Sequence, residues 1–392
     1  MRCPKCGTVW TDGADFCGNC GAVLPKRKKG VLRAFFAAVL FVAIFFTCQS
    51  VVLLTHTVNT VSSDSEYMAA TENYASVLIN SETTEEELNA AVERETNALR
   101  NAISKAVNTI TEHYSLILLI GDLLAILVVS LIFRIRKREP KKDFRVCMIN
   151  PARLITFALF GAALFFIVTA VLNLLPFSEQ TITDYEAGQT MILGMGDPLP
   201  LRIITTVIVV PITEELFFRS LVIRNFKPTI GPAASVIVSA IIFGASHFAF
   251  SISSLISVVY AAIVGLLFAA IFVKYDSIIP SIICHAFFNL MDFMPLRNDA
   301  RTALPILAIA AAVAAFCFYR IFVRYPTFSD VLFNTDSIPA INEEEGRIFE
   351  RVREMKESTE PVNRDELDEL AKAWDDNRRA YKESKKDKSS EE

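Results

Sequence analysis

The sequence has little histidine, little net charge and no internal repetition. Four of its 392 residues are histidine, so a site built on imidazole groups must draw on this small set. The formal net charge of −4 averages over different compartments, and we expect no nucleic-acid partner. No repeat is long enough to suggest a transporter built from duplicated halves.

Hydrophobic and charged residues are instead segregated along the chain. The sequence is 52% hydrophobic and 21% charged, and apolar runs near membrane length alternate with short charged loops. Roughly 20 apolar residues cross a bilayer as a helix. We therefore predict an all-α, polytopic membrane bundle of about eight helices. The expected spans are 31–54, 114–133, 151–175, 201–223, 232–250, 254–273, 277–294 and 303–322.

The distribution of Lys and Arg predicts the orientation. Residues 26–29 are all basic, and the loop 134–150 holds seven basic residues. By contrast, residues 176–200 hold four acidic and no basic residues, and residues 55–113 hold ten acidic against three basic ones. Basic loops stay in the cytoplasm. We expect a multi-pass protein of the cell membrane with both termini cytoplasmic, and an even number of spans agrees.

Five regions follow from these patterns. They are a Cys-rich head (1–24), a basic linker with the first span (25–54), an extracytoplasmic helical insert (55–113), a transmembrane core (114–322) and a charged, helical cytoplasmic tail (323–392). Within the insert, apolar residues near helical spacing predict a helix around 85–110. The head and the tail both suit binding to a protein partner.

The head contains two Cys-x2-Cys pairs separated by ten residues, which are Cys3, Cys6, Cys17 and Cys20. This spacing predicts a tetrahedral zinc site, whose folding energy a segment of this size needs. Two disulfides are the alternative, but thiols stay reduced in the cytoplasm. The head resembles short N-terminal zinc ribbons of bacterial membrane proteins. Four thiolates leave no open coordination position, so the zinc is structural.

Polar residues inside three late spans form the candidate site. Ionisable groups in a membrane are costly and usually functional. The residues are Glu214, Glu215 and Arg219 in the fourth span, Phe243 and His247 in the fifth, and His285 and Asn289 in the seventh.

Helical spacing separates the roles of the two glutamates. Glu215 and Arg219 are four residues apart and can pair on one face, whereas Glu214 is rotated by about 100°. One carboxylate can therefore be neutralised while its neighbour stays free. A Glu in an apolar cavity can act as a general base on water. His285 and Asn289, one turn apart, can direct two donors at an oxyanion. A purely structural Glu–Arg pair is the alternative.

The combination of Glu-Glu-x3-Arg, Phe-x3-His and His-x3-Asn resembles the CPBP family of intramembrane glutamic endopeptidases. This family includes type II CAAX prenyl proteases and Abi proteins. The resemblance covers about residues 150–322 and implies that Glu214 activates water, that His247 helps hold it, and that His285 and Asn289 stabilise the oxyanion. It gives Glu215 and Arg219, with Phe243, a supporting role, and implies hydrolysis of a membrane-associated peptide or protein.

Three alternatives stay open. The first is a zinc-dependent form of the same peptidase, although the usual His-Glu-x2-His motif is absent and we expect no catalytic metal. The second is a non-catalytic binding, immunity or scaffold protein, and the third is a transporter with a proton relay. The expected boundaries also leave Glu214 roughly 13 Å and His247 roughly 22 Å from the cytoplasmic side. They meet only if the fourth helix continues past Arg224 towards Lys227, or if the spans tilt.

Overall fold

The computed structural model describes residues 30–138, 144–147, 149–192, 196–249, 251–294, 300–323, 341–357 and 364–390. Helices make up 88% of the structure, and these ranges contain no strand. The predicted all-α membrane bundle is therefore confirmed. The four cysteines of the expected zinc ribbon lie outside the described residues.

Within these described ranges, five helices are long and apolar enough to cross a membrane. They are α1 (Val31–Ser62), α4 (Tyr114–Ile135), α6 (Leu154–Leu174), α12 (Ser254–Tyr275) and α14 (Ala300–Phe318). A 3-10 turn, η1 (Pro151–Arg153), precedes α6, and a π-helical turn, η5 (Tyr319–Val323), follows α14. A multi-pass membrane protein follows from these helices.

Two shorter apolar helices complete the bundle, α11 (Pro232–Ala245) and α13 (Ile278–Leu290), the latter followed by a 3-10 turn, η4 (Met291–Phe293). Together with the helix that carries Glu214, they occupy the remaining expected spans. The total of eight membrane crossings stays a prediction.

The helix that carries Glu214 is continuous but changes its winding. It consists of α8 (Leu199–Ile203), η2 (Ile204–Val209), α9 (Val210–Glu214), η3 (Glu215–Ile223) and α10 (Arg224–Ile230). The segments η2 and η3 are π-helical, a rare winding that is common at functional sites. The helix ends at Gly231, whose positive φ of 86° reverses the chain before Pro232 starts α11. The expected end at 223 is wrong by seven residues.

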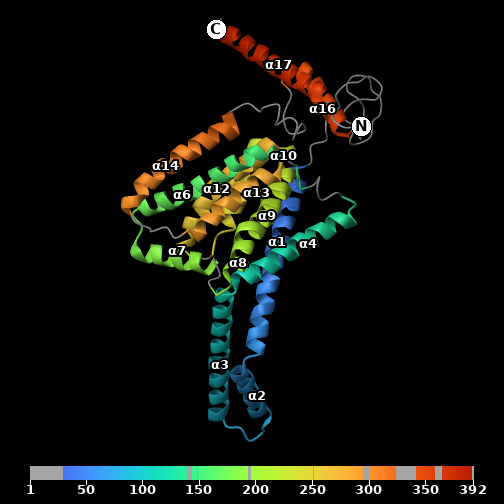
Figure 1. Ribbon diagram of the computed structural model, residues 1–392. Coiled ribbons are helices and arrows are strands. Elements are labelled where there is room, and N and C mark those ends of the chain that lie inside the picture. The colour runs from blue at the N-terminus through green and yellow to red at the C-terminus, as the bar shows by residue number, and fades with distance from the viewer. Residues whose placement is uncertain are drawn as a thin grey trace.

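A helical stalk leaves one end of the bundle (Figure 1). It consists of the end of α1 with α2 (Ser65–Ile79) and α3 (Glu85–Glu112), the latter over the range where a helix was predicted. Asp64 caps α2, and Thr84 and Glu87 form a capping box at α3. Small side chains on one face of α3 let the helices approach closely, and these are Ala91, Ala98, Ala102 and Ala106.

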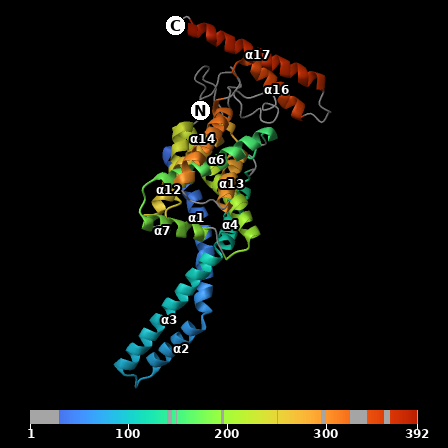
Figure 2. The same ribbon diagram turned by 60° about the vertical axis from the view of Figure 1, so that its left-hand side comes forward.

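The stalk defines the two ends of the bundle. Helix α7 (Glu179–Ile192) lies at the stalk end in both views (Figures 1 and 2). Helices α16 (Glu343–Glu357) and α17 (Arg364–Ser390) lie beyond the opposite end and pack on each other through Ile348, Phe349, Val352 and Trp374. In the described part of the basic loop, Arg145 pairs with Asp276, the residue that follows α12.

Glycines bring the site-bearing helices close together. A Cβ on Gly161 of α6 would meet the backbone of Cys284 in α13, and one on Gly244 of α11 would meet Val258 and Ala262 of α12. Small residues at helix crossings are typical of membrane bundles, where packing and not the hydrophobic effect holds helices together. These contacts hold α13, which carries His285 and Asn289, against α6, and α11, which carries Phe243, against α12.

Candidate active site within the membrane bundle

A cavity of about 460 Å³ lies inside the bundle towards the stalk end. Helices α1, α4, α7, α9, α12 and α13 contribute to its wall, as does the connection from α11 to α12. The wall includes Glu214, His247, His285 and Asn289, the four residues predicted to be catalytic. The structure therefore brings residues from three separate segments to one space that can hold a substrate.

The extra length of the fourth helix explains how Glu214 and His247 share this cavity. Because the helix runs to Ile230, Glu214 lies 16 residues, or roughly 24 Å, from its end. His247 lies 15 residues, or roughly 22 Å, past the start of α11 on the same side. Glu214 and His247 therefore lie at nearly the same depth. The continuation of the fourth helix past Arg224, one of the two possibilities expected from the sequence, explains why both residues line one cavity.

Glu215 and Arg219 form a fully buried ion pair, as the spacing predicted. Their side chains are both 0% exposed, and Nε of Arg219 lies 3.1 Å from Oε2 of Glu215. The guanidinium also stacks 4.3 Å from the ring centre of Phe243. Buried charges of this kind persist in a low-dielectric site only when they are paired.

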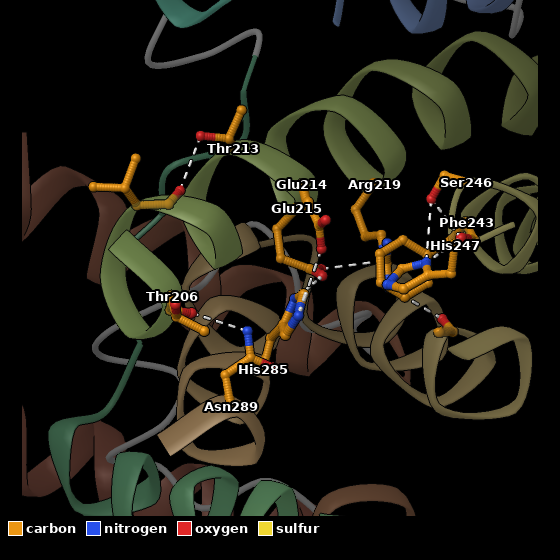
Figure 3. Close-up of polar contacts among 12 residues, drawn as sticks. Thr206, Thr213, Glu214, Glu215, Arg219, Phe243, Ser246, His247, His285 and Asn289 are labelled. Carbon is orange, nitrogen blue, oxygen red and sulfur yellow. Dashed lines mark hydrogen bonds and ion pairs between the residues drawn. The ribbon is translucent and has the colours of Figure 1, made fainter. Parts of the chain in front are cut away.

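His285 joins the two glutamates (Figure 3). Its Nδ1 lies 3.0 Å from Oε1 of Glu215, and its Nε2 lies 3.6 Å from Oε2 of Glu214. Because an ionised carboxylate only accepts, Nδ1 must carry a hydrogen, and the neutral imidazole then presents an unprotonated Nε2 to Glu214. Only the imidazolium form of His285 has an Nε2–H to donate to an oxyanion.

Glu215 is thus occupied on both oxygens, while Glu214 faces the cavity. The side chain of Glu214 is 15% exposed, whereas that of Glu215 is 0% exposed. This division between a paired and an available carboxylate is the one that the sequence predicted. It makes Glu214 the glutamate that can reach a water molecule in the cavity.

His247 lies in the turn after α11 and not inside a helix. The expected fifth span, 232–250, is therefore too long, since α11 ends at Ala245. Both Oγ of Ser246 and Nδ1 of His247 donate to the carbonyl of Phe243, at 2.6 and 2.9 Å, which satisfies a carbonyl at the helix end. A carbonyl only accepts, so Nδ1 carries the hydrogen and Nε2 is the proton acceptor.

Asn289 binds the π-helical segment beside the site. Its Nδ2 donates to the carbonyl of Thr206 at 2.9 Å. In an α-helix this carbonyl would accept from the N–H of Val210, and in a π-helix from that of residue 211. The N–H of Val210 donates to the carbonyl of Thr205 instead, and Pro211 has no N–H, so the carbonyl of Thr206 has neither helical donor. Asn289 therefore holds α13 against the helix of Glu214, and its predicted role at an oxyanion would use the second N–H of the same amide.

Other polar residues near the site were missed by the sequence analysis. Asp122 of α4 is 1% exposed and accepts a hydrogen bond from Gln49 of α1 at 2.9 Å. Asp292, just after α13, lines the cavity. Each acid interrupts an apolar span, and that isolated charge was the signal that could have identified it.

The described residues contain no group of three His, Cys, Asp or Glu side chains arranged to hold a metal ion. Glu214 and His285 are in contact, but Nδ1 of His285 is committed to Glu215. The contacts of His285 thus join two carboxylates and one imidazole into a cluster of acid–base groups.

Comparisons with known proteins agree with the motifs. Residues 197–291 match the family model described as Type II CAAX prenyl endopeptidase Rce1-like, and residues 2–24 match a zinc-ribbon domain. The human protein CAAX prenyl protease 2 is 27% identical over 108 residues, which are 24% of this chain and 33% of that protein. The chain thus aligns with about a third of the length of this relative. No solved structure gives a significant match. The predicted resemblance and the predicted zinc ribbon are confirmed as domain matches.

Proposed function

We propose that this protein is an intramembrane endopeptidase in which Glu214 activates the attacking water. The observation that carries the proposal is the division of labour between adjacent glutamates. Glu215 is held by Arg219 and His285, and Glu214 lines a cavity large enough for a peptide segment. The match of residues 197–291 to the Rce1-like family supports the same reaction class.

The reaction needs no group beyond these side chains and water. Glu214 removes a proton from the water molecule while the water oxygen bonds to the carbonyl carbon of the peptide. This attack forms a tetrahedral oxyanion. The protonated Glu214 then gives a proton to the leaving nitrogen as the C–N bond breaks. The acceptor Nε2 of His247 holds the water, and His285, in its imidazolium form, and Asn289 stabilise the oxyanion. Glu215 stabilises that imidazolium through Nδ1.

A matched pair of variants tests this assignment. Glu214→Gln keeps the shape of the side chain but removes the base, and we expect cleavage of membrane peptides to fall by at least about 10³-fold. Glu93→Gln, on an exposed position of α3, is the control and should cleave as wild type does. Peptides released in detergent or liposomes are identified by mass spectrometry. Unchanged cleavage in both Glu214→Gln and His247→Ala removes the peptidase assignment, while binding without cleavage by wild type favours a binding or immunity protein.

The remaining proposals concern location and partners. The substrate is a membrane-associated peptide or protein, and the protein lies in the cell membrane with both termini in the cytoplasm. The positive-inside rule supports this orientation, since residues 134–150 hold seven basic residues, whereas residues 176–200 hold four acidic and no basic ones. The cysteines at 3, 6, 17 and 20 would hold one structural zinc ion.

A further inference from the structure

A second cavity, of about 380 Å³, adjoins the catalytic cavity at the stalk end of the bundle. The two cavities share wall residues from α7, α12, α13 and the turn η4, which are Tyr185, Gln189, Tyr260, Phe288 and Asp292. Nε2 of Gln189 reaches Oγ of Ser257 at 3.5 Å, which connects α7 to α12 across this wall. A peptide that extends from Glu214 towards α7 therefore enters the second cavity.

The second cavity combines an apolar side with an acidic side. The apolar side is formed by Phe165, Val168, Leu172 and Phe177. The acidic side has Glu186 on α7 and Asp292 after α13, and Asp184 lies on the adjoining wall of the catalytic cavity. Among the described residues that line either cavity, none is Lys or Arg.

This arrangement matches the two parts of a basic side chain. Lys and Arg carry an aliphatic stem that packs on apolar surface and a cationic head that needs a polar partner. Apolar walls lower the local dielectric constant, which strengthens attraction between the cation and the carboxylates. An acidic side chain or a free carboxyl terminus in the same place would be repelled, which adds discrimination.

We propose that this second cavity is the specificity subsite of the peptidase and takes a Lys or Arg side chain flanking the scissile bond. The inference rests on the proposed function, because a subsite has meaning only beside a catalytic centre. The substrate class is then a membrane peptide with a basic residue near the cleavage point, reached from the end of the bundle that carries the stalk and α7.

The test compares matched peptides with the full-length protein in detergent. First, wild type and Glu214→Gln are compared, so that only Glu214-dependent cleavage sites are used. Each peptide is then made with Lys or Gln at the positions on either side of the cleaved bond. We expect kcat/KM to be higher for the Lys peptide by roughly tenfold or more, as for close charge pairs at interfaces.

Variants of Asp292 identify the group responsible. Asp292→Asn should bring the Lys/Gln ratio of kcat/KM towards one, and Asp292→Lys should favour a Glu peptide over the Lys peptide. Asp375→Asn, on the exposed face of α17, is the control and should keep the wild-type ratio.

Two results separate the failure of each claim. If Glu214→Gln cleaves as wild type does, the proposed function fails whatever the charge preference. If cleavage depends on Glu214 but shows no preference for Lys, or if the preference survives both Asp292 variants, the subsite assignment is wrong and the peptidase assignment stands.

Discussion

The buried pair of Glu215 and Arg219 gives a sharp test of how the site is held together. In Arg219→Met, the carboxylate of Glu215 keeps its bond to His285 but loses the cation beside Oε2. Both side chains are 0% exposed, so water does not replace the lost partner. Removing one member of a buried pair costs about 3–5 kcal/mol.

That loss is large enough to measure by thermal unfolding. For a folded unit of this size, 1 kcal/mol shifts Tm by roughly 2–4 °C, so the expected fall is about 6–20 °C. The bundle contains three buried free cysteines, Cys48, Cys284 and Cys317, whose exposure reports on its unfolding. A thiol-reactive fluorogenic dye added during heating in detergent therefore measures Tm of the relevant region.

The double variant Glu215→Gln/Arg219→Met distinguishes a pair from two independent residues. It removes both charges, so most of the lost stability should return relative to either single variant. As a control, Arg351→Met breaks the ion pairs with Glu354 and Glu366 on a side chain that is 52% exposed, and should cost less than about 1 kcal/mol. If both single variants unfold within about 2 °C of wild type, or if their effects add in the double variant, the reasoning about this pair is wrong.

Three further predictions concern packing, pH and metal. Gly161→Ala should lower Tm, because the added Cβ meets the backbone of α13 and should reduce the free energy of unfolding by about 1–3 kcal/mol. Gly346→Ala is the control and should leave Tm unchanged, because its Cβ meets open space. In the stalk, Lys105 of α3 donates a hydrogen bond to Asp64 and holds the pKa of this carboxyl below its usual value of 3.8. The bond therefore stabilises the stalk fully at pH values above 3.8, and this stability is lost as the pH falls through the lowered pKa. The protection factor of α2 amides against hydrogen exchange, corrected for the pH dependence of the intrinsic exchange rate, should therefore fall as the pH drops below 3.8, and this change should be smaller in Asp64→Asn. Elemental analysis should find one zinc per chain, and none after Cys3→Ser/Cys6→Ser.

The sequence was sufficient for the parts of the fold that depend on length and spacing. Runs of apolar residues located the membrane helices, and the spacing of Glu215 and Arg219 predicted their pairing because it needs only one local helical turn. The separation of Glu214 from its neighbour follows from the same geometry. These features are local, so no tertiary contact had to be known in advance.

Features that depend on contacts between helices could not be read in this way. The π-helical segment η2 leaves the carbonyl of Thr206 without its helical donors, and Asn289, 83 residues later, supplies the missing hydrogen bond. Sequence spacing around Pro211 predicts a disturbed helix but not which residue compensates. The position of His247 outside α11 likewise depends on its bond to the carbonyl of Phe243.

The segment that matches the peptidase family does not by itself enclose the cavity that Glu214 lines. Phe45 and Gln49 of α1 and Tyr114 of α4 form part of the wall, and all three precede residue 197, where the family match begins. A Cβ on Gly121 would lie only 3.1 Å from Cα of Gln49, so the two helices touch at this level and Asp122 is sealed beneath the contact. The hydrogen bond from Gln49 to Asp122 fixes the same crossing. Because these residues form part of the wall around Glu214, residues 197–291 alone would leave the cavity incomplete, and the water that we propose Glu214 activates needs the preceding helices to stay in place.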